Sequence, residues 1–107
     1  MSVQEVTVAE LEAALRDGAR VIDVRETDEY TAGHVPGAVH IALGTVPDHV
    51  DAFRAPEPVY VVCRSGARSM RACEFLAQQG IIAINVAGGT LDWVAGNRAV
   101  VLGSEPL

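Results

Sequence analysis

Short apolar segments that alternate with helical segments are the feature that most limits what this chain can fold into. Residues 59–62 are continuously apolar, as in a central strand covered on both faces. Residues 81–86 predict a second apolar strand, and the β-branched run at 20–25 predicts a third. Strands that alternate with helices need crossover connections, which produce a mostly parallel sheet. We therefore expect an α/β fold of three layers, in which helices cover both faces of the sheet.

The first predicted helix carries signals at both ends. Thr7 as N-cap and Glu10 at the third helical position form a capping box, and Val6 and Leu11 are placed for a hydrophobic staple. Gly18 supplies the C-terminal stop.

The remaining elements are short and follow one another without a break. We predict helices at 27–32, 47–53 and 67–79, a last one capped by Thr90 and running through Trp93, and strand segments at 39–42 and 99–101. No repeat, low-complexity tract or linker divides them. We therefore expect a single domain over residues 1–107.

The charge of the chain excludes several classes of partner. Its net charge is −6, whereas nucleic acids and anionic membranes require a basic surface. The apolar runs are far shorter than the ~18 residues that cross a bilayer. The first residues, Met1 to Glu5, contain neither a basic nor an apolar targeting region. We therefore expect no nucleic-acid or membrane partner and a cytoplasmic location.

The basic residues are unevenly distributed. All eight are arginine, and Arg64, Arg68 and Arg71 fall within eight positions of one another. Guanidinium groups suit small oxyanions because their planar forks donate two parallel hydrogen bonds. One interpretation of the cluster is thus a local site for a small anion, and the alternative is an ordinary solvated helix face.

The two cysteines, Cys63 and Cys73, are neither a C-x-x-C pair nor spaced with the histidines as metal ligands. We therefore expect no metal and no cofactor. A reducing compartment disfavours a structural disulfide, and one cysteine precedes the predicted helix while the other lies well inside it. Cys73 is interpreted as a small buried hydrophobic residue.

Cys63 is the candidate nucleophile because it is the first residue past a central strand. Ligands of open α/β sheets bind beyond the carboxyl ends of the strands. The loop after Cys63 enters a helix directly, so its amides and the positive helix end can converge on one anion. Nearby arginines add positive charge, so the pKa of Cys63 should fall below the ~8.5 of a free cysteine. The alternative is a buried cysteine followed by a surface turn.

The rest of the loop supplies the predicted substrate-binding residues. Gly66 leaves room for a curled backbone and permits positive φ. Two hydroxyl groups add donors, although Ser69 can instead cap the helix. The complete set is Arg64, Ser65, Gly66, Ala67, Arg68 and Ser69.

Four ordered blocks resemble a rhodanese-homology domain, and the resemblance runs nearly from end to end. The matching blocks are Ile22-Asp23-Val24-Arg25-Glu26, Gly33-His34-Val35-Pro36-Gly37-Ala38, Val61-Val62-Cys63-Arg64-Ser65-Gly66-Ala67-Arg68-Ser69, and Gly88-Gly89 followed by Trp93. The resemblance implies a sulfurtransferase with a double-displacement reaction. Cys63 would take a sulfane sulfur from a small anionic donor such as thiosulfate, form a persulfide, and pass the sulfur to cyanide or a thiol.

Loop length and loop charge refine what the resemblance implies. Sulfurtransferases of this family have six-residue loops that start at the cysteine, which corresponds here to Cys63 through Arg68. The related phosphatases use Cys-x5-Arg, one residue longer than the Cys-x4-Arg of this chain. Arg64 and Arg68 resemble the basic loops of thiosulfate-using members. Ala99 departs from the family pattern near a position where many relatives have proline.

Several other residues have two interpretations. Asp23 and Arg25 follow the family's Asp-x-Arg pattern and could pair with each other or orient the active loop. His34 lies in a Gly-His-x-Pro-Gly turn, which favours a structural hydrogen bond over a general-base role. His40 and His49 have no partner set typical of a metal site or a triad.

Two other function classes stay open. One is a phosphatase or arsenate reductase of the same fold, which the loop length disfavours. The other is a persulfide carrier that hands sulfur from Cys63 to a partner, such as a thioredoxin-like or sulfur-carrier protein. Carriers use the same loop, so the sequence leaves this alternative in place.

Overall fold

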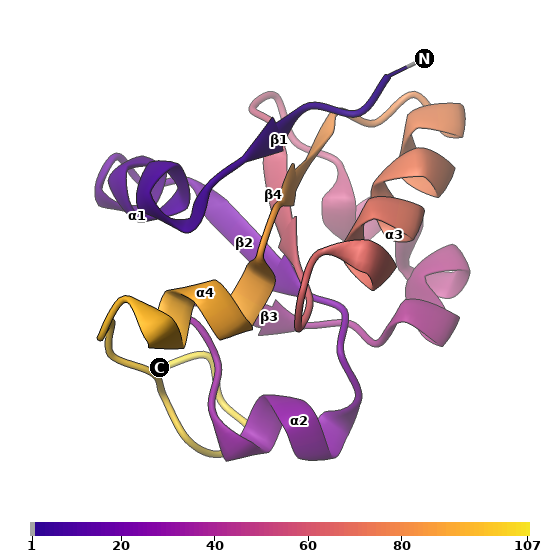
Figure 1. Cartoon of the computed structure of the whole chain (residues 1–107). Helices are drawn as coiled ribbons and strands as arrows, with labels where there is room; N and C mark the ends of the chain where they lie inside the picture. Colours follow the sequence, from indigo (N-terminus) through magenta and orange to yellow (C-terminus); the bar gives the residue numbers. More distant parts are fainter. Residues whose placement is uncertain (1) are drawn as a thin grey trace.

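The computed structural model describes residues 2–107, and its strands and helices alternate as predicted, with one unpredicted short strand before the first helix (Figure 1). The elements in chain order are β1 (Glu5–Val6), α1 (Val8–Arg16), β2 (Arg20–Asp23), α2 (Thr27–Ala32), β3 (Val39–His40), the 3₁₀ segment η1 (Leu43–Phe53), β4 (Val59–Val62), α3 (Ala67–Gln78), β5 (Ala83–Val86) and α4 (Gly89–Ala95).

The five strands form one parallel sheet in the order β1-β5-β4-β2-β3. Strand β4 is central, and its Val61 lies opposite Ile22 of β2 on one side and Asn85 of β5 on the other. Because all strands run the same way, their carboxyl ends meet at one edge of the sheet. The loop that begins at Cys63 leaves the sheet at the middle of this edge.

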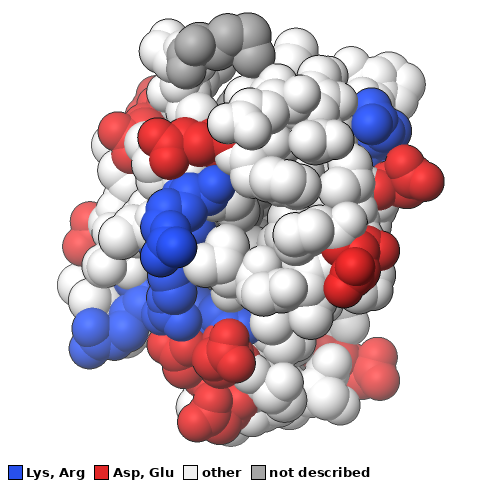
Figure 2. Space-filling view, turned by 90° about the vertical axis from the view of Figure 1, so that its right-hand side faces the viewer, with Lys and Arg blue, Asp and Glu red and all other residues white. Residues whose placement is uncertain are grey.

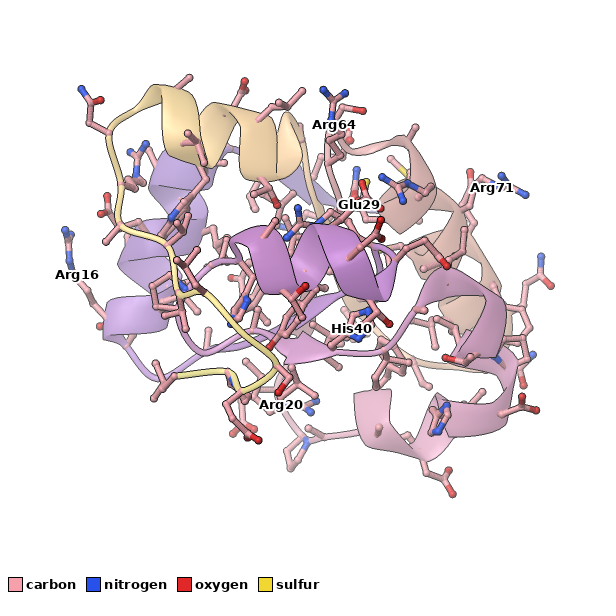
Figure 3. All side chains as sticks on the ribbon, turned by 90° about the horizontal axis from the view of Figure 1, so that it is seen from below. Arg16, Arg20, Glu29, His40, Arg64 and Arg71 are labelled. Carbon is pink, nitrogen blue, oxygen red and sulfur yellow. The ribbon has the colours of Figure 1, made fainter. Side chains whose placement is uncertain are left out.

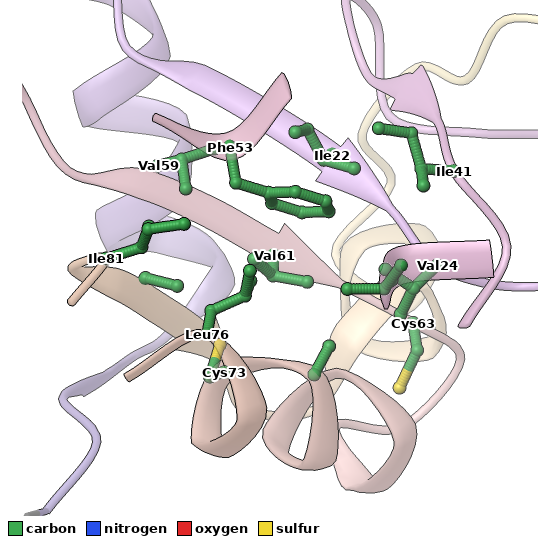
Figure 4. Close-up of a cluster of buried hydrophobic side chains, with 13 residues drawn as sticks. Ile22, Val24, Ile41, Phe53, Val59, Val61, Cys63, Cys73, Leu76 and Ile81 are labelled. Carbon is green, nitrogen blue, oxygen red and sulfur yellow. The ribbon is translucent and has the colours of Figure 1, made fainter. Parts of the chain in front are cut away.

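Helices cover both faces of the sheet, which confirms the three-layer α/β prediction. Under α3 and η1 lies one buried cluster, which includes Ile22, Phe53, Val61 and Leu76 (Figure 4). A second cluster lies against α1, α2 and α4 and is built around Leu11, Val21, Tyr30, Val62 and Trp93. Val61 and Val62 are both fully buried, as a central strand with two covered faces requires.

The start of α1 has the predicted geometry. The Glu10 amide donates to Thr7 Oγ1 at 3.2 Å, and the Thr7 amide donates to Glu10 Oε1 at 2.9 Å, so the capping box is complete. Val6 and Leu11 lie in the same buried cluster, as a hydrophobic staple requires. Gly18 follows the helix with φ of +88°.

Several predicted boundaries are wrong, and tertiary contacts explain one of them. The last helix begins at Gly89 with Gly88 as its N-cap, because the Thr90 hydroxyl donates to the Cys63 carbonyl instead of capping the helix. The strand predicted at 81–86 begins only at Ala83. The segment predicted to be helical from residue 47 starts earlier, at Leu43, as 3₁₀ turns. Strand β3 has two residues, and the tail forms only one bridge, between Val101 and His34.

Within residues 2–107, none of the helices combines the length and apolar character needed to cross a membrane.

A buried ion pair holds the carboxyl end of β2. The Asp23 carboxylate accepts hydrogen bonds from the Arg25 amide at 2.9 Å and from its guanidinium at 2.9–3.1 Å. The same guanidinium donates to the Gly33 carbonyl at the end of α2, at 2.8 Å. Asp23 is fully buried and Arg25 nearly so. The pair therefore ties α2 to the sheet beside the loop of Cys63.

We expect Arg25→Leu to lower the free energy of unfolding by about 3–5 kcal/mol, because the Asp23 carboxylate would be left buried without its counterion. Urea denaturation measures the change. Arg54→Leu is the matched control: its partner Asp51 is 98% exposed, so removing that pair should cost less than about 1 kcal/mol. Equal costs for the two variants would contradict the role given to the buried pair.

Candidate active site around Cys63

The loop after β4 curls tightly before α3 begins. Cys63 is its first residue, and Gly66 at its end is the N-cap of α3 with φ of +108°. A Cβ on Gly66 would be in ordinary van der Waals contact with the backbone of residues 86–88, at 3.4–3.5 Å. The φ angle, and not a lack of space, therefore makes any other side chain at this position strained. The prediction that Gly66 permits a positive φ is confirmed.

The thiol of Cys63 lies beneath this loop. The residue is 1% exposed, and Figure 4 shows its sulfur directed toward α3. The Gly66 amide lies 3.1 Å from Sγ and the Ser69 hydroxyl 3.3 Å from it, both as potential donors. Donors from the loop and from the first turn of α3 thus converge on one sulfur atom.

Burial and hydrogen bonding act in opposite directions on the pKa of Cys63. Burial raises the pKa of the thiol, but hydrogen bonds from the Ser69 hydroxyl and from the amides of Ser69, Gly66 and Ser65 lower it by more, so the pKa lies below its ordinary value of 9.0. This direction agrees with the sequence prediction. The largest lowering contributions come from these donors and not from the arginines, to which the prediction gave part of the effect.

The arginines around the loop are not equivalent. Arg68 forms a two-pronged ion pair with Glu29 of α2, with N–O distances of 2.8 and 2.9 Å. This hydrogen bond lowers the pKa of Glu29 to about 2. Arg64 and Arg71 are exposed, and Figure 3 shows both projecting outward. In the described part of the chain, no carboxylate pairs with either of them.

Basic side chains gather in one stripe on the face that carries α3, with acidic side chains above and below it (Figure 2). The basic residues of α3 and of the loop before it are Arg64, Arg68 and Arg71. Three of the eight arginines of this acidic protein therefore lie beside the candidate site.

The start of α4 packs against the loop that begins at Cys63. The Thr90 amide and hydroxyl both donate to the Cys63 carbonyl, at 2.9 and 3.0 Å, and the Leu91 amide donates to the Arg64 carbonyl at 3.0 Å. A Cβ on Gly89 would lie 2.4 Å from the Cys63 carbonyl oxygen, closer than any side chain can approach. Gly89, the first residue of α4, therefore allows this helix to pack directly on the loop.

A second layer of polar groups lies behind Ser69. Its hydroxyl is 2.5 Å from Asn85 Oδ1 on the neighbouring strand β5. The Asn85 amide nitrogen donates to Glu5 Oε2 of β1 at 2.8 Å and to the Gly66 carbonyl at 3.1 Å. Ser69 and Asn85 are both buried, whereas Glu5 is exposed. The thiol is thus connected through side chains to the edge of the sheet.

A hollow of about 590 Å³ opens beside the loop, between α2 and α4. Arg64 and Glu29 border it, and apolar side chains of α4 and of the C-terminal segment line much of it. Two of these, Leu91 and Val94, are 46% and 52% exposed. An apolar surface therefore lies next to the arginine that follows Cys63.

Other candidates from the sequence lie away from the thiol or pair elsewhere. Asp23 and Arg25 pair with each other, one of the two roles considered for them. The ring nitrogens of the buried His34 lie 2.8 Å from the Tyr30 carbonyl and 2.9 Å from the Glu105 carbonyl, the structural arrangement favoured for it.

The remaining histidine, tryptophan and cysteine candidates have structural contacts. His40 bonds the Arg25 carbonyl at 2.7 Å, and the buried Trp93 donates to the Ala99 carbonyl at 2.8 Å. Cys73 is a free, buried cysteine, and burial raises its pKa to about 12. Within the described residues, no His, Cys, Asp and Glu side chains group as metal ligands.

Sequence reasoning missed four residues of the site: Glu5, Glu29, Asn85 and Thr90. Only one weak signal could have found any of them, because Asn85 is a polar residue in an otherwise apolar strand. The acidic residues lie on distant elements with nothing in their neighbourhood to distinguish them from other exposed carboxylates.

Known proteins share both the sequence pattern and the fold. The sequence profile of the rhodanese-like domain matches residues 7–96. YtwF of Bacillus subtilis is 36% identical over 95 residues, which span 87% of this chain and 92% of YtwF. The thiosulfate sulfurtransferase GlpE of Pseudomonas putida is 35% identical over 86 residues, or 79% of this chain and 78% of GlpE.

A solved structure supports the same assignment. The rhodanese-like domain protein of Staphylococcus aureus superposes with a TM-score of 0.86 at 34% identity, covering 95% of this chain and all of that one. The profile match covers most of the chain, and the relatives are alike in sequence, length and fold. The chain therefore belongs to the rhodanese-like domain family, and its relatives place it among proteins of the sulfurtransferase type.

Proposed function

We propose that this protein is a thiosulfate sulfurtransferase that works through a persulfide on Cys63. The observation that carries the proposal is the convergence of the Gly66 amide and the Ser69 hydroxyl on Cys63 Sγ, which favours the thiolate. A low-pKa thiolate is a nucleophile that needs no separate base. The name of the Pseudomonas putida relative supports thiosulfate as the donor.

The reaction balances without any further reactant. A lone pair of the Cys63 thiolate attacks the outer sulfur of thiosulfate and forms a new S–S bond, while the S–S bond of thiosulfate breaks and sulfite leaves with its electron pair. The negative charge then lies on the terminal sulfur of the persulfide. Cyanide or an acceptor thiolate attacks that sulfur, and the electron pair of the breaking bond returns to Sγ.

The buried position of Cys63 suits a persulfide. An S–S bond of about 2.05 Å carries the terminal sulfur outward from Sγ, toward the space that the loop amides surround. Amide donors can hold the charge there without a counterion. The loop from Cys63 to Arg68 is one residue shorter than the phosphatase pattern, so it favours a single sulfur atom over a tetrahedral phosphate.

The arginine that we expect to meet the donor is Arg64. Arg68 is already committed to Glu29, whereas Arg64 is exposed next to Cys63 and borders the hollow beside the loop. A free guanidinium binds an oxyanion with two parallel hydrogen bonds. This assignment modifies the sequence hypothesis, in which Arg64 and Arg68 contributed alike.

One observation favours a second candidate, transfer of the persulfide sulfur to a partner protein. The exposed apolar residues Leu91 and Val94 line the hollow that Arg64 borders. Contact with apolar side chains does not help to bind a small anion such as thiosulfate or cyanide. A thioredoxin-like or sulfur-carrier acceptor would bury such a surface. The carrier role uses the same chemistry at Cys63 and differs only in the acceptor.

Incubation with thiosulfate should add the mass of one sulfur atom to the protein, and cyanide should remove it and produce thiocyanate. Intact-mass spectrometry and a thiocyanate assay follow the two steps. Cys63→Ser should gain no sulfur, and Cys73→Ser, the matched control, should behave as the wild type because Cys73 is buried with a raised pKa. Wild-type protein that never gains sulfur, or an active Cys63→Ser variant, would refute the proposal.

The alkylation of Cys63 by iodoacetamide should follow its ionisation. Because the pKa of Cys63 is lowered from 9.0, the rate should fall as the pH falls, with a midpoint below pH 9. Cys73 should stay unmodified in the same samples, since its pKa is about 12. Mass mapping of the peptides gives both rates, and a Cys63 midpoint at or above 9 would contradict the hydrogen-bonding account.

Replacing Arg64 by alanine should raise KM for thiosulfate by about tenfold, or ~1.4 kcal/mol, with a smaller change in kcat. Steady-state kinetics at fixed ionic strength measure both. Arg16→Ala is the matched control, since Arg16 is exposed on the distant helix α1 (Figure 3) and screening should leave KM within about twofold. An unchanged KM in Arg64→Ala would remove Arg64 from the donor site.

A further inference from the structure

The hydroxyl of Ser69 lies between two groups that compete for its proton. Its oxygen is 3.3 Å from Cys63 Sγ and 2.5 Å from Asn85 Oδ1, and all three residues are at most 1% exposed. A serine hydroxyl carries one proton, so it donates to one acceptor at a time.

The orientation of the Asn85 amide decides which of its atoms meets Ser69. The group 2.8 Å from the Glu5 carboxylate and 3.1 Å from the Gly66 carbonyl must be the NH₂, since both neighbours only accept hydrogen bonds. The oxygen Oδ1 therefore faces the Ser69 hydroxyl and can only accept. When Cys63 is a neutral thiol, its S–H can donate to Ser69 Oγ while the Ser69 proton points to Asn85.

The charge on Sγ changes during sulfur transfer, and the best position of that proton changes with it. In the free thiolate the full negative charge lies on Sγ, so each additional hydrogen-bond donor stabilises it. In the persulfide Sγ is bonded to a second sulfur and the charge has moved to the terminal atom. The Ser69 proton is then free to return to Asn85.

We propose that Asn85 is a positioning residue whose Oδ1 competes with Cys63 Sγ for the Ser69 proton, which points to Sγ in the thiolate and to Asn85 in the persulfide. The persulfide half of this statement rests on the function proposed above. Asn85 thereby stabilises the persulfide relative to the free thiolate. Glu5 acts one step further away, because its carboxylate and the Gly66 carbonyl together hold the Asn85 amide in the orientation that presents Oδ1.

The first test reads the thiol alone and requires no sulfur transfer. Alkylation rates of reduced protein as a function of pH give the Cys63 pKa in wild type, Ser69→Ala, Asn85→Leu and the double variant. Ser69→Ala should raise the midpoint by about one unit, because the thiolate loses a donor. Asn85→Leu should lower it by up to about one unit, because Ser69 donates to the thiolate without a competitor.

The double variant separates this role from general damage to the site. Because the proposed competition runs through the Ser69 hydroxyl, Asn85→Leu should have no further effect on the midpoint in the Ser69→Ala background. A raised or unchanged midpoint in Asn85→Leu, or shifts that simply add in the double variant, would overturn the proposal.

Exposed variants test the same chain of contacts without touching the core. Glu5→Ala and Glu5→Gln both remove a negative charge, but only glutamine keeps an acceptor for the Asn85 NH₂. We expect Glu5→Ala to lower the Cys63 midpoint more than Glu5→Gln does, because the freed amide can turn its NH₂ toward Ser69. Equal midpoints would overturn the orienting role of Glu5, and this part of the proposal stays testable if Asn85→Leu fails to fold.

A second readout follows the persulfide. At a fixed ratio of thiosulfate to sulfite, the fraction of persulfide on Cys63, measured by intact mass, should fall several-fold in Asn85→Leu relative to wild type. An unchanged fraction would overturn the persulfide half of the proposal. If wild type forms no persulfide, the proposed function fails, whereas the alkylation profiles still decide whether Asn85 competes for the Ser69 proton.

Discussion

The convergence of hydrogen-bond donors on a buried sulfur is the interaction on which the arrangement of this protein depends. Cys63 is nearly inaccessible, a position that by itself would keep a thiol neutral. The amides of the loop and the Ser69 hydroxyl reverse that tendency. These donors all come from the loop after β4 and from the first turn of α3, so a small displacement of either element would separate the donors from the sulfur.

The surrounding structure keeps this segment in place from three sides. Helix α4 packs against it through Thr90 and Leu91, which bond the carbonyls of Cys63 and Arg64. Strand β5 reaches it through Asn85, which bonds the Gly66 carbonyl and faces Ser69. Helix α2 reaches it through the ion pair of Glu29 with Arg68. The loop is therefore held by backbone and side-chain contacts from elements that are distant in sequence.

Neutral hydrogen-bond donors and charged groups lie at different distances from the sulfur. Near the sulfur, the groups that favour negative charge are amides and a hydroxyl. Their hydrogen bonds offset the free-energy cost of burying these polar groups. The charged arginines lie farther out, where Arg68 is neutralised by Glu29 and Arg64 faces solvent beside the apolar hollow. In the proposed reaction, such an arrangement would allow the charge to move between the two sulfur atoms of the persulfide without a counterion that favours only one of them.

The sequence by itself determined the fold class, the parallel sheet and the position of the loop, because these follow from local patterns. The apolar run before Cys63, the glycine at position 66 and the capping box of Thr7 and Glu10 each act over a few residues, and the structure agrees with all three. Only the tertiary structure decided which groups meet the loop. Glu5, Glu29, Asn85 and Thr90 come from four different elements, and parallel strand order and helix packing bring them together. Apart from the polar Asn85 in an apolar strand, the local sequence around these residues does not indicate that they meet the loop, because the contacts join elements far apart in the chain.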